Sequence, residues 1–457
     1  MTTSCISIRG VDTLLFRDGR PFDATPGGRA ETLRIPAPST VAGFVRAKIG
    51  KHPDSGWDKI TDDVRLRGPL LARLDVERSA QTIVYPAPAD AVVYRSAGAI
   101  DSEETLKTMM LRPLAEGSSI SDIPGGMRVM EVKGEEKPET GYAYWTAGDM
   151  DLWLRDEWPD GKTPCRIEEL ATDARVHVQI GSGGVADDGK LFITEMVSFE
   201  RHVQDFTTGK ASVSETWSLL CKLDTNRDTA GLAGPGQLGG ESRTAIVEAG
   251  VDGWPVCSEE LKKRLRDSGR VRMVLATPAV FELGWLPQWL DATTKIGAPP
   301  GIEGDVQLKL VAACVPRRQA ISGWDYSKRE EGNSKKPGGP KPVRWLAPAG
   351  SVYFFEVVSG SASVLADKCW LEPVSDPESH ENGNRVENNR NDGFRTCALG
   401  EFGAKRRANH VHSDCQANIL TRAHAAAPWN RTSRSTWSIC PLPAKRRPAG
   451  RLFPAAA

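Results

Sequence analysis

The sequence lacks several features that would assign it to a class at once. Its 457 residues contain 59 basic and 59 acidic side chains, so the bulk charge does not indicate a nucleic-acid-binding protein. No apolar run approaches the roughly 20 residues needed to span a bilayer, and the first residues lack the basic and apolar regions of an export signal. The nine cysteines include no C-x-x-C pair. We therefore expect reduced thiols in a cytoplasmic protein, without disulfides or a zinc site.

Signals of catalysis and of cofactor binding are also missing. No Ser/His/Asp set, paired-carboxylate motif or metal-ligand cluster stands out. Residues 234–239 satisfy G-x-G-x-x-G, but polar residues precede them and β-branched residues follow. A dinucleotide-binding fold requires a strand before this loop and a helix after it, so that class is excluded. We expect no cofactor, no metal and no catalytic residue.

The stretch from residue 12 to residue 46 carries the first candidate site. An apolar run ends at Phe16 and is followed by the turn Arg17-Asp18-Gly19-Arg20. The later segment 40–48 has apolar residues at helical spacing, and Ser39 or Thr40 is suited to cap that helix. A helix start with free amides and nearby arginines, Arg46 included, is a usual way to meet a phosphate backbone. The alternative is an ordinary strand, turn and helix without a role in phosphate binding, as in any α/β enzyme.

A glycine-rich loop carries the second candidate site. Residues 231–243 read GLAGPGQLGGESR and lead into a β-branched segment. Exposed amides and a terminal arginine suit a phosphate backbone, whereas the alternative is a plain tight turn. The candidate residues of this loop are Gly236, Gly239, Gly240 and Arg243.

The remaining patterns predict an α+β chain of two domains. Residues 142–158 are rich in aromatics, and we interpret them as core rather than as a base-stacking surface. Residues 96–141 are polar and are expected to form an excursion such as a hairpin. His177 lies between two valines in a predicted strand, which favours a structural histidine over a catalytic one. The chain from residue 395 onward has a net charge of +9 and no apolar periodicity.

Several motifs, in order, resemble those of one family. FRDGRPF and PAPSTVAGFVR are followed by G-P, YPAPAD, LGGESR, a TPA element, GWLP and PAGSVYFF. This set, from about residue 12 to residue 356, is similar to the third subunit of the Cmr complex, the type III-B CRISPR effector. That subunit is a RAMP protein of the Cas-five-like group.

The resemblance implies a fold and a domain plan. It implies two ferredoxin-like (RRM-like) RAMP domains, with the first at 1–250 and carrying an insertion at about 51–170. A degenerate second copy is expected at 268–394, followed by a basic tail at 395–457. The family's closing Gly-Phe-Gly segment is replaced here after Phe394. Either a reading-frame shift near residue 394 leaves a tail without a fold, or the tail is a genuine disordered RNA-binding segment.

The resemblance also implies a function. The family's role is to bind the repeat-derived 5′ handle of the guide RNA in antiviral defence, without catalysis, and to join the large polymerase/cyclase-like subunit to the backbone RAMP subunits. Two alternatives remain open, a CRISPR RNA processing endoribonuclease that uses a histidine and a purely structural scaffold. The RNA-binding residues that we predict are Arg17, Arg20, Ser39, Thr40, Arg46, Gly236, Gly239, Gly240 and Arg243.

Overall fold

The fold is mixed α and β, with many strands and few helices. The computed structural model describes residues 1–20, 22, 28–52, 56–57, 63–74, 81–96, 105–116, 123, 126–132, 137–205, 210–329, 337–376, 379–381, 384–387, 392–393 and 396–402. The helices among them are α1 (Pro38–Ile49), α2 (Ala147–Leu154), α3 (Glu259–Asp267) and α4 (Ser363–Lys368).

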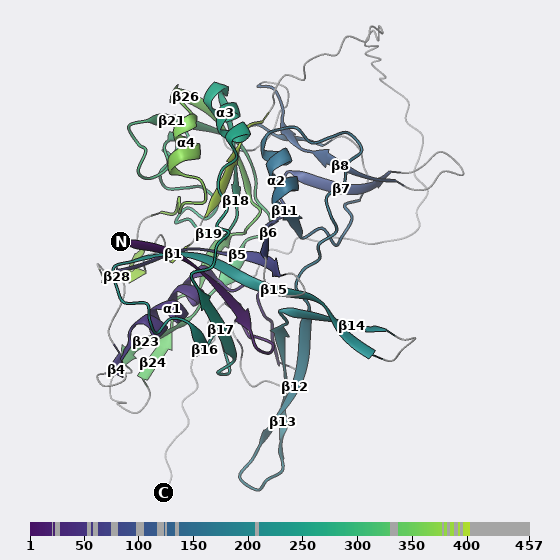
Figure 1. The fold of residues 1–457 in the computed structure, drawn as a ribbon, viewed down its shortest axis with the longest axis vertical. Coiled ribbons are helices and arrows are strands. Elements are labelled where there is room, and N and C mark those ends of the chain that lie inside the picture. Colours follow the sequence, from purple (N-terminus) through teal and green to yellow (C-terminus); the bar gives the residue numbers. More distant parts are fainter. Residues whose placement is uncertain are drawn as a thin grey trace, which may run out of the picture. The chain divides into compact units, whose positions relative to one another are not determined.

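The first sheet is built around the N-terminal strand, β1 (Figure 1). Ile6 and Ile8 of β1 are buried and pack in one apolar cluster with Val41 and Val45 of α1. These helix residues are four apart, so they share the face of α1 that covers the sheet. The strand order is β11-β6-β5-β15-β1-β17-β16, and the bounds are β1 (Thr2–Gly10), β5 (Val64–Leu74), β6 (Gln81–Pro86), β11 (Tyr144–Thr146), β15 (Lys210–Thr225), β16 (Gly234–Gln237) and β17 (Thr244–Ala249), with β14 (Glu200–Asp205) paired to β15.

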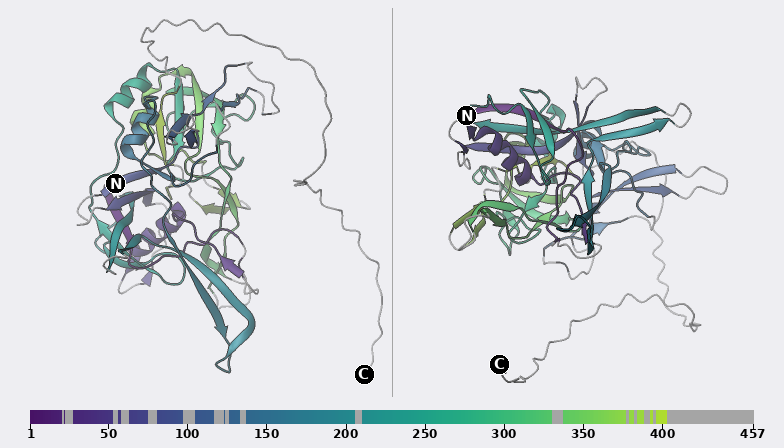
Figure 2. Two further views of the ribbon diagram at one scale, coloured as in Figure 1. Left: turned by 90° about the vertical axis from the view of Figure 1, so that its right-hand side faces the viewer. Right: turned by 90° about the horizontal axis from the view of Figure 1, so that it is seen from below.

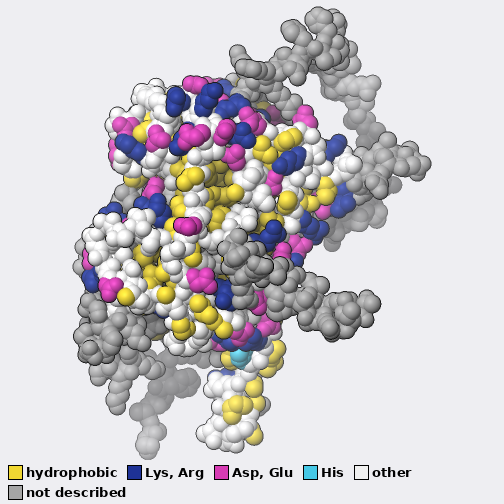
Figure 3. All heavy atoms as spheres, viewed as in Figure 1, with side chains coloured by type: hydrophobic (Ala, Val, Ile, Leu, Met, Phe, Trp, Pro, Cys, Tyr) yellow, Lys and Arg dark blue, Asp and Glu magenta, His cyan; other side chains and the backbone are white. Residues whose placement is uncertain are grey.

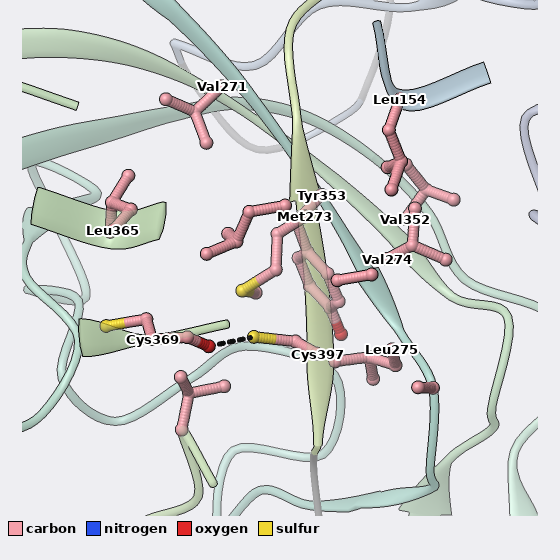
Figure 4. Packing of buried hydrophobic residues seen from close by; sticks show 14 of the residues in the cluster. Leu154, Val271, Met273, Val274, Leu275, Val352, Tyr353, Leu365, Cys369 and Cys397 are labelled. Atoms are coloured by element: carbon pink, nitrogen blue, oxygen red, sulfur yellow. Dashed lines mark hydrogen bonds between the residues drawn. The ribbon is translucent and has the colours of Figure 1, made fainter. Parts of the chain in front are cut away.

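The second sheet forms the core of the C-terminal half. Tyr353, Phe354 and Phe355 of its long strand β26 are fully buried, which is why the PAGSVYFF segment reads as a continuous apolar strand. Figure 4 shows this core, with residues of β18, β26 and β29 meeting Leu365 of α4. The strand order is β20-β21-β26-β18-β29, and the bounds are β18 (Arg270–Leu275), β20 (Ile296–Gly297), β21 (Val306–Cys314), β26 (Val352–Gly360) and β29 (Cys397–Gly400).

A long hairpin projects away from the first sheet (Figures 1 and 2). It consists of β12 (Thr172–Ile180) and β13 (Ala186–Val197), and the short strand β2 (Gly28–Ala30) pairs with β13 in parallel. The smaller strands are β3 (Lys51–His52), β4 (Gly56–Trp57), β7 (Ala91–Ser96), β8 (Thr105–Met110), β9 (Arg112–Pro113), β10 (Met130–Glu131), β19 (Ala279–Val280), β22 (Gln319–Ile321), β23 (Trp324–Arg329), β24 (Pro337–Pro340), β25 (Arg344–Ala347), β27 (Ser379–Glu381) and β28 (Asn384–Glu387).

Motifs that lie far apart in the sequence meet where the two sheets join. The amide of Gly68 donates to the hydroxyl of Thr396 at 3.2 Å, and the amide of Thr396 donates to the hydroxyl of Thr277 at 2.9 Å. Nearby, the amide of Ala89 donates to the carbonyl of Gly350 at 2.8 Å. The G-P, PAPAD, TPA and PAGS motifs therefore belong to the junction between the two sheets.

Several expectations about particular segments can be compared with the structure. The aromatic segment is core, because Trp145 and Trp153 are buried and pack edge to face with ring centroids 5.1 Å apart. The strands β7 and β8 form a hairpin that runs across the start of the region 96–141, which was expected to be an excursion. The predicted insertion at 51–170 is too long, since β5, β6 and β11 lie inside that range but are strands of the first sheet.

The predicted start of the tail is also too early. Strand β29 pairs with β18, and Cys397, Ala398 and Leu399 are buried. Phe402 packs edge to face on Phe354 with ring centroids 5.0 Å apart. Residues 396–402 therefore belong to the second sheet and its core, and the reading-frame shift near residue 394 stays a hypothesis that the nucleotide sequence tests. The predictions for residues 403–457 lie outside the described residues.

Candidate nucleic-acid interface

The two candidate sites that lie more than 200 residues apart in the sequence are in contact. The amide of Gly240 donates to the carbonyl of Leu15 at 2.8 Å. Gly239 has a φ of +83°, and a Cβ at this position would clash with the carbonyl oxygen of Leu15. The tight turn at 238–243 therefore needs glycine in order to lie against the residues that precede the Arg17–Arg20 turn.

Gly236 has a similar packing role on the other side of the loop. It lies in β16, and a Cβ added to it would come within 2.7 Å of a ring carbon of Phe44 in α1. The ammonium of Lys48, one helical turn further on, donates to the carbonyl of Pro235 at 2.9 Å. These glycines therefore let the loop pack closely against α1 and against Leu15, which precedes the Arg17–Arg20 turn.

Arg243 is engaged in a network of charged side chains. Its guanidinium donates to Asp12 at 3.0 Å and lies 3.7 Å from Glu241. Arg175 of β12 donates to the hydroxyl of Thr13 at 3.0 Å and to Asp173 at 2.8 Å. The hydrogen bond to Asp173 is the main cause that raises the pKa of Arg175. This network ties the glycine turn, the loop after β1 and the base of the hairpin together.

Arg17 and Arg20 are both exposed, but their surroundings differ. Arg20 forms ion pairs with Asp18 at 3.0 Å and Glu31 at 2.7 Å. The guanidinium of Arg17 lies over the ring of Phe22, 5.1 Å from its centroid. Among the described residues Arg17 forms no ion pair. Arg17 is therefore the cation of this turn with the least internal compensation.

The start of α1 differs from the prediction. The N-cap is Ala37, not Ser39 or Thr40, and no side chain caps the helix. Pro38 is the first helical residue and has no N–H, while the amide of Thr40 donates to the carbonyl of Ala37 at 2.9 Å. Ala37 and Pro38 are buried, so the helix start does not present the free, outward-facing amides that we expected.

Arg46 has a structural environment. Its guanidinium pairs with the buried carboxylate of Asp392 and donates to the carbonyl of Val64 at 3.1 Å. Only 16% of its side chain is exposed. Arg46 therefore joins α1 to β5 and to the C-terminal half, and we do not place it among the residues that face RNA.

His177 lies on the face of the hairpin that carries an aromatic row. Its ring stacks on Phe192 with centroids 5.1 Å apart, and Phe192 meets Phe22 edge to face at 5.7 Å. The Nε2 atom of His177 lies 2.7 Å from the hydroxyl of Thr194. These contacts agree with the structural interpretation of His177, and the side chain of the other internal histidine, His202, lies outside the described set.

The row of Phe22, Phe192 and His177 was not predicted from the sequence. No local pattern in the sequence indicates it, because Phe192 lies opposite His177 only in the register that the hairpin adopts. The hairpin also exposes apolar side chains (Figure 3). These are Val176, Val178, Ile180, Val185 and Leu191.

Metal and membrane sites receive no support from the described part of the chain. There, no group of three or more His, Cys, Asp or Glu side chains could hold a metal ion. None of the helices that the structure describes is long and apolar enough to cross a membrane.

Comparison with known proteins gives one family. The model of the family described as CRISPR-associated protein (Cas_Cmr3) matches residues 6–402. No curated protein matches the chain. Among solved structures, a chain of the type III-B Cmr-beta complex bound to cognate target RNA, determined by cryo-EM, is similar with a TM-score of 0.39 and 13% identity, over 77% of this chain and 86% of that chain. A chain of Cmr-beta bound to cognate target RNA and AMPPnP, state 1, is similar with a TM-score of 0.37 and 12% identity, over 87% and 99%.

Proposed function

Because the chain belongs to the Cas_Cmr3 family of CRISPR-associated proteins, we propose that it is a non-catalytic RNA-binding subunit of a type III-B CRISPR (Cmr) interference complex in the cytoplasm. In this role it holds the 5′ repeat-derived handle of the guide RNA. It also bridges the large polymerase/cyclase-like subunit to the backbone RAMP subunits in antiviral defence.

One observation carries the RNA-binding part of the proposal. The turn that bears Arg17 and Arg20 rests on the glycine loop through the contact between Gly240 and Leu15. The turn thereby presents two exposed guanidinium groups beside the ring of Phe22. Guanidinium groups position a phosphate backbone, and aromatic rings stack on the splayed bases of single-stranded RNA.

The strand order supports the finer claim that the chain contains two ferredoxin-like RAMP units. In the first sheet the order β5-β15-β1-β17 places the first strand between the third and the fourth, with every neighbouring pair antiparallel. The order β21-β26-β18-β29 repeats this pattern in the second sheet. One helix position of each unit is kept, by α1 after β1 and by α4 after β26. This is the pattern of a β-α-β-β-α-β unit with one helix replaced.

A salt titration of RNA binding tests the role of the turn. The full chain and its Arg17→Ala/Arg20→Ala variant are titrated with guide RNA that carries the 5′ handle, at several salt concentrations. We expect weaker binding at low salt and a slope of log K against log salt that is shallower by about 1.4, since each lost phosphate contact to a single strand removes about 0.7. Arg266→Ala is the matched control, because Arg266 is exposed on α3 and forms no ion pair among the described residues. Unchanged affinity and slope in the double variant would contradict the assignment.

A co-expression experiment tests the assembly. The chain is expressed with the products of its neighbouring genes and a CRISPR array, and the RNA that co-purifies is sequenced. Guide RNAs with a common 5′ handle, together with a large subunit and a repeated backbone subunit, are the expected result. Cleavage of the RNA by this chain alone would favour the endoribonuclease alternative. Assembly that survives while the double variant leaves RNA binding unchanged would favour a scaffold.

A further inference from the structure

Another pairing of a cation with an aromatic ring lies on the surface of the C-terminal half. The guanidinium of Arg318 lies 3.9 Å from the centroid of the Trp345 ring, and 45% of Trp345 is exposed. Trp345 is in β25, and Arg318 comes just before the neighbouring strand β22. A tryptophan left open to solvent beneath an ordered guanidinium is a surface on which another flat π system can stack.

The charge on this surface is not compensated from within. Among the described residues most arginines pair with a carboxylate, as the exposed Arg20 does with Asp18 and Glu31. Arg317 and Arg318 are exposed, and in the described chain neither forms an ion pair. They share this property with Arg17. Free guanidinium groups beside an open ring are suited to a polyanion that also carries aromatic bases.

The surface is continuous with the turn proposed above to bind RNA. The amide of Gly19 donates to the carbonyl of Ala320 in β22 at 3.0 Å. A Cβ on Gly19 would come within 2.9 Å of the backbone of Ile321, so the turn lies directly against this strand. Ala320 is the register partner of Trp345. One strand therefore separates the Arg17–Arg20 turn from Trp345.

We propose that Trp345 and Arg318 form a platform on which one unpaired base of the bound RNA stacks, while Arg317 meets an adjacent phosphate. This inference rests on the proposed function and extends its RNA surface from the first half of the chain to the second. Stacking on the indole or on the guanidinium plane requires no particular base, so the platform holds single-stranded RNA without reading its sequence. Its role is to continue the path of the strand beyond the turn.

The test uses the full chain and the guide RNA recovered with it, synthesised with 2-aminopurine at successive positions. In the native protein, stacking on the platform should quench the fluorescence of one position. Trp345→Ala should abolish that quenching and raise Kd by about 5- to 150-fold, the range for loss of one base–aromatic stack, with the salt slope unchanged. Trp345→Phe, which keeps a ring, should retain most of the affinity. Arg317→Ala, which removes the proposed phosphate contact, should lower the salt slope by about 0.7, and Arg266→Ala should match the native chain.

The outcomes separate this inference from the proposed function. If the native chain binds RNA and the Arg17→Ala/Arg20→Ala variant weakens it, but Trp345→Ala and Arg317→Ala bind as the native chain does, the platform is refuted and the proposed function stands. If the native chain binds no RNA, both fail. If Trp345→Ala leaves RNA binding intact but releases a co-purifying subunit, the surface is a protein interface and the inference is overturned. A thermal melt of each variant checks that it is folded.

Discussion

Arginines at the junction between the two sheets and arginines on the outer turns are used in opposite ways. Arg272 is fully buried, pairs with the buried Asp90 at 3.1 Å, and donates to the carbonyl of Trp153. Arg17 and Arg318 are exposed, lie over aromatic rings, and have no ion pair within the described chain. The first kind joins segments distant in the sequence, whereas the second kind is left available to a ligand.

The difference shows that charge count alone is a poor guide to function in this chain. Residues 1–394 are acidic overall. Most of their described arginines form internal ion pairs, such as Arg67 with Asp224 and Glu372. Arg17, Arg317 and Arg318 are among the few that form no ion pair within the described chain. The comparison therefore predicts that substitutions at the junction lower stability, while substitutions on the outer turns lower affinity.

The largest effect is expected for Arg272→Met. Burial raises the pKa of Asp90, and the positive charge of Arg272 counters that rise. The substitution removes this charge and leaves the carboxyl group of Asp90 buried without its cation. Breaking a buried pair by removal of one partner typically costs about 3–5 kcal/mol of the free energy of unfolding. Chemical denaturation measures it. The matched control Arg318→Ala should change the free energy by less than about 0.5 kcal/mol. Equal losses of unfolding free energy for the two substitutions would contradict the distinction between junction arginines and outer-turn arginines.

An intermediate effect is expected for Gly239→Ala, which tests whether the outer turn is held by backbone packing. The added Cβ meets the carbonyl of Leu15, and alanine is strained at a φ of +83°. We expect a loss of about 1–3 kcal/mol. Gly161→Ala is the control, since Gly161 has a φ of +77° and a Cβ added there would have no atom within 4 Å. A denaturation midpoint that falls no further for Gly239→Ala than for Gly161→Ala would show that the contact with Leu15 is unimportant.

The smallest effect is the pH dependence that Asp224 contributes. Burial alone would raise the pKa of Asp224, but hydrogen bonds from Thr3 and Arg67 and the charge of Arg67 lower it below its usual value. A carboxyl whose pKa is lower in the folded state adds stability above its unfolded pKa of about 3.9, and this is lost as the pH falls through the folded pKa.

We therefore expect the free energy of unfolding to decrease as the pH is lowered below about 4. The decrease should be shallower in Asp224→Asn, because that side chain no longer titrates. Urea midpoints between about pH 3 and pH 6 measure the slope. Parallel curves for the two proteins would mean that the contacts of Asp224 with Thr3 and Arg67 do not stabilise its charge.

Local patterns in the sequence were enough for some of the fold. The helical spacing of the apolar residues at 40–48 predicted a helix, which is confirmed as α1. The apolar run from Val352 to Phe355 is typical of a buried strand and forms part of β26. The aromatic segment around Trp153 was assigned to the core, also correctly. These features follow from periodicity and propensity, which act over a few neighbouring residues. The ordered motifs also identified the family.

Tertiary structure decided the rest. Arg46 looked like an RNA ligand beside Arg17, yet its partner Asp392 lies 346 positions away. The β29 strand at 397–400 becomes recognisable only once β18 is beside it. Trp345 and the turn around Gly19 meet through a strand that no local pattern links to either. The sequence by itself determined the strongly patterned segments, such as α1, and the family to which the chain belongs. Which arginines are paired and which remain free depends on side chains brought together by long-range contacts, and only the folded chain decides this.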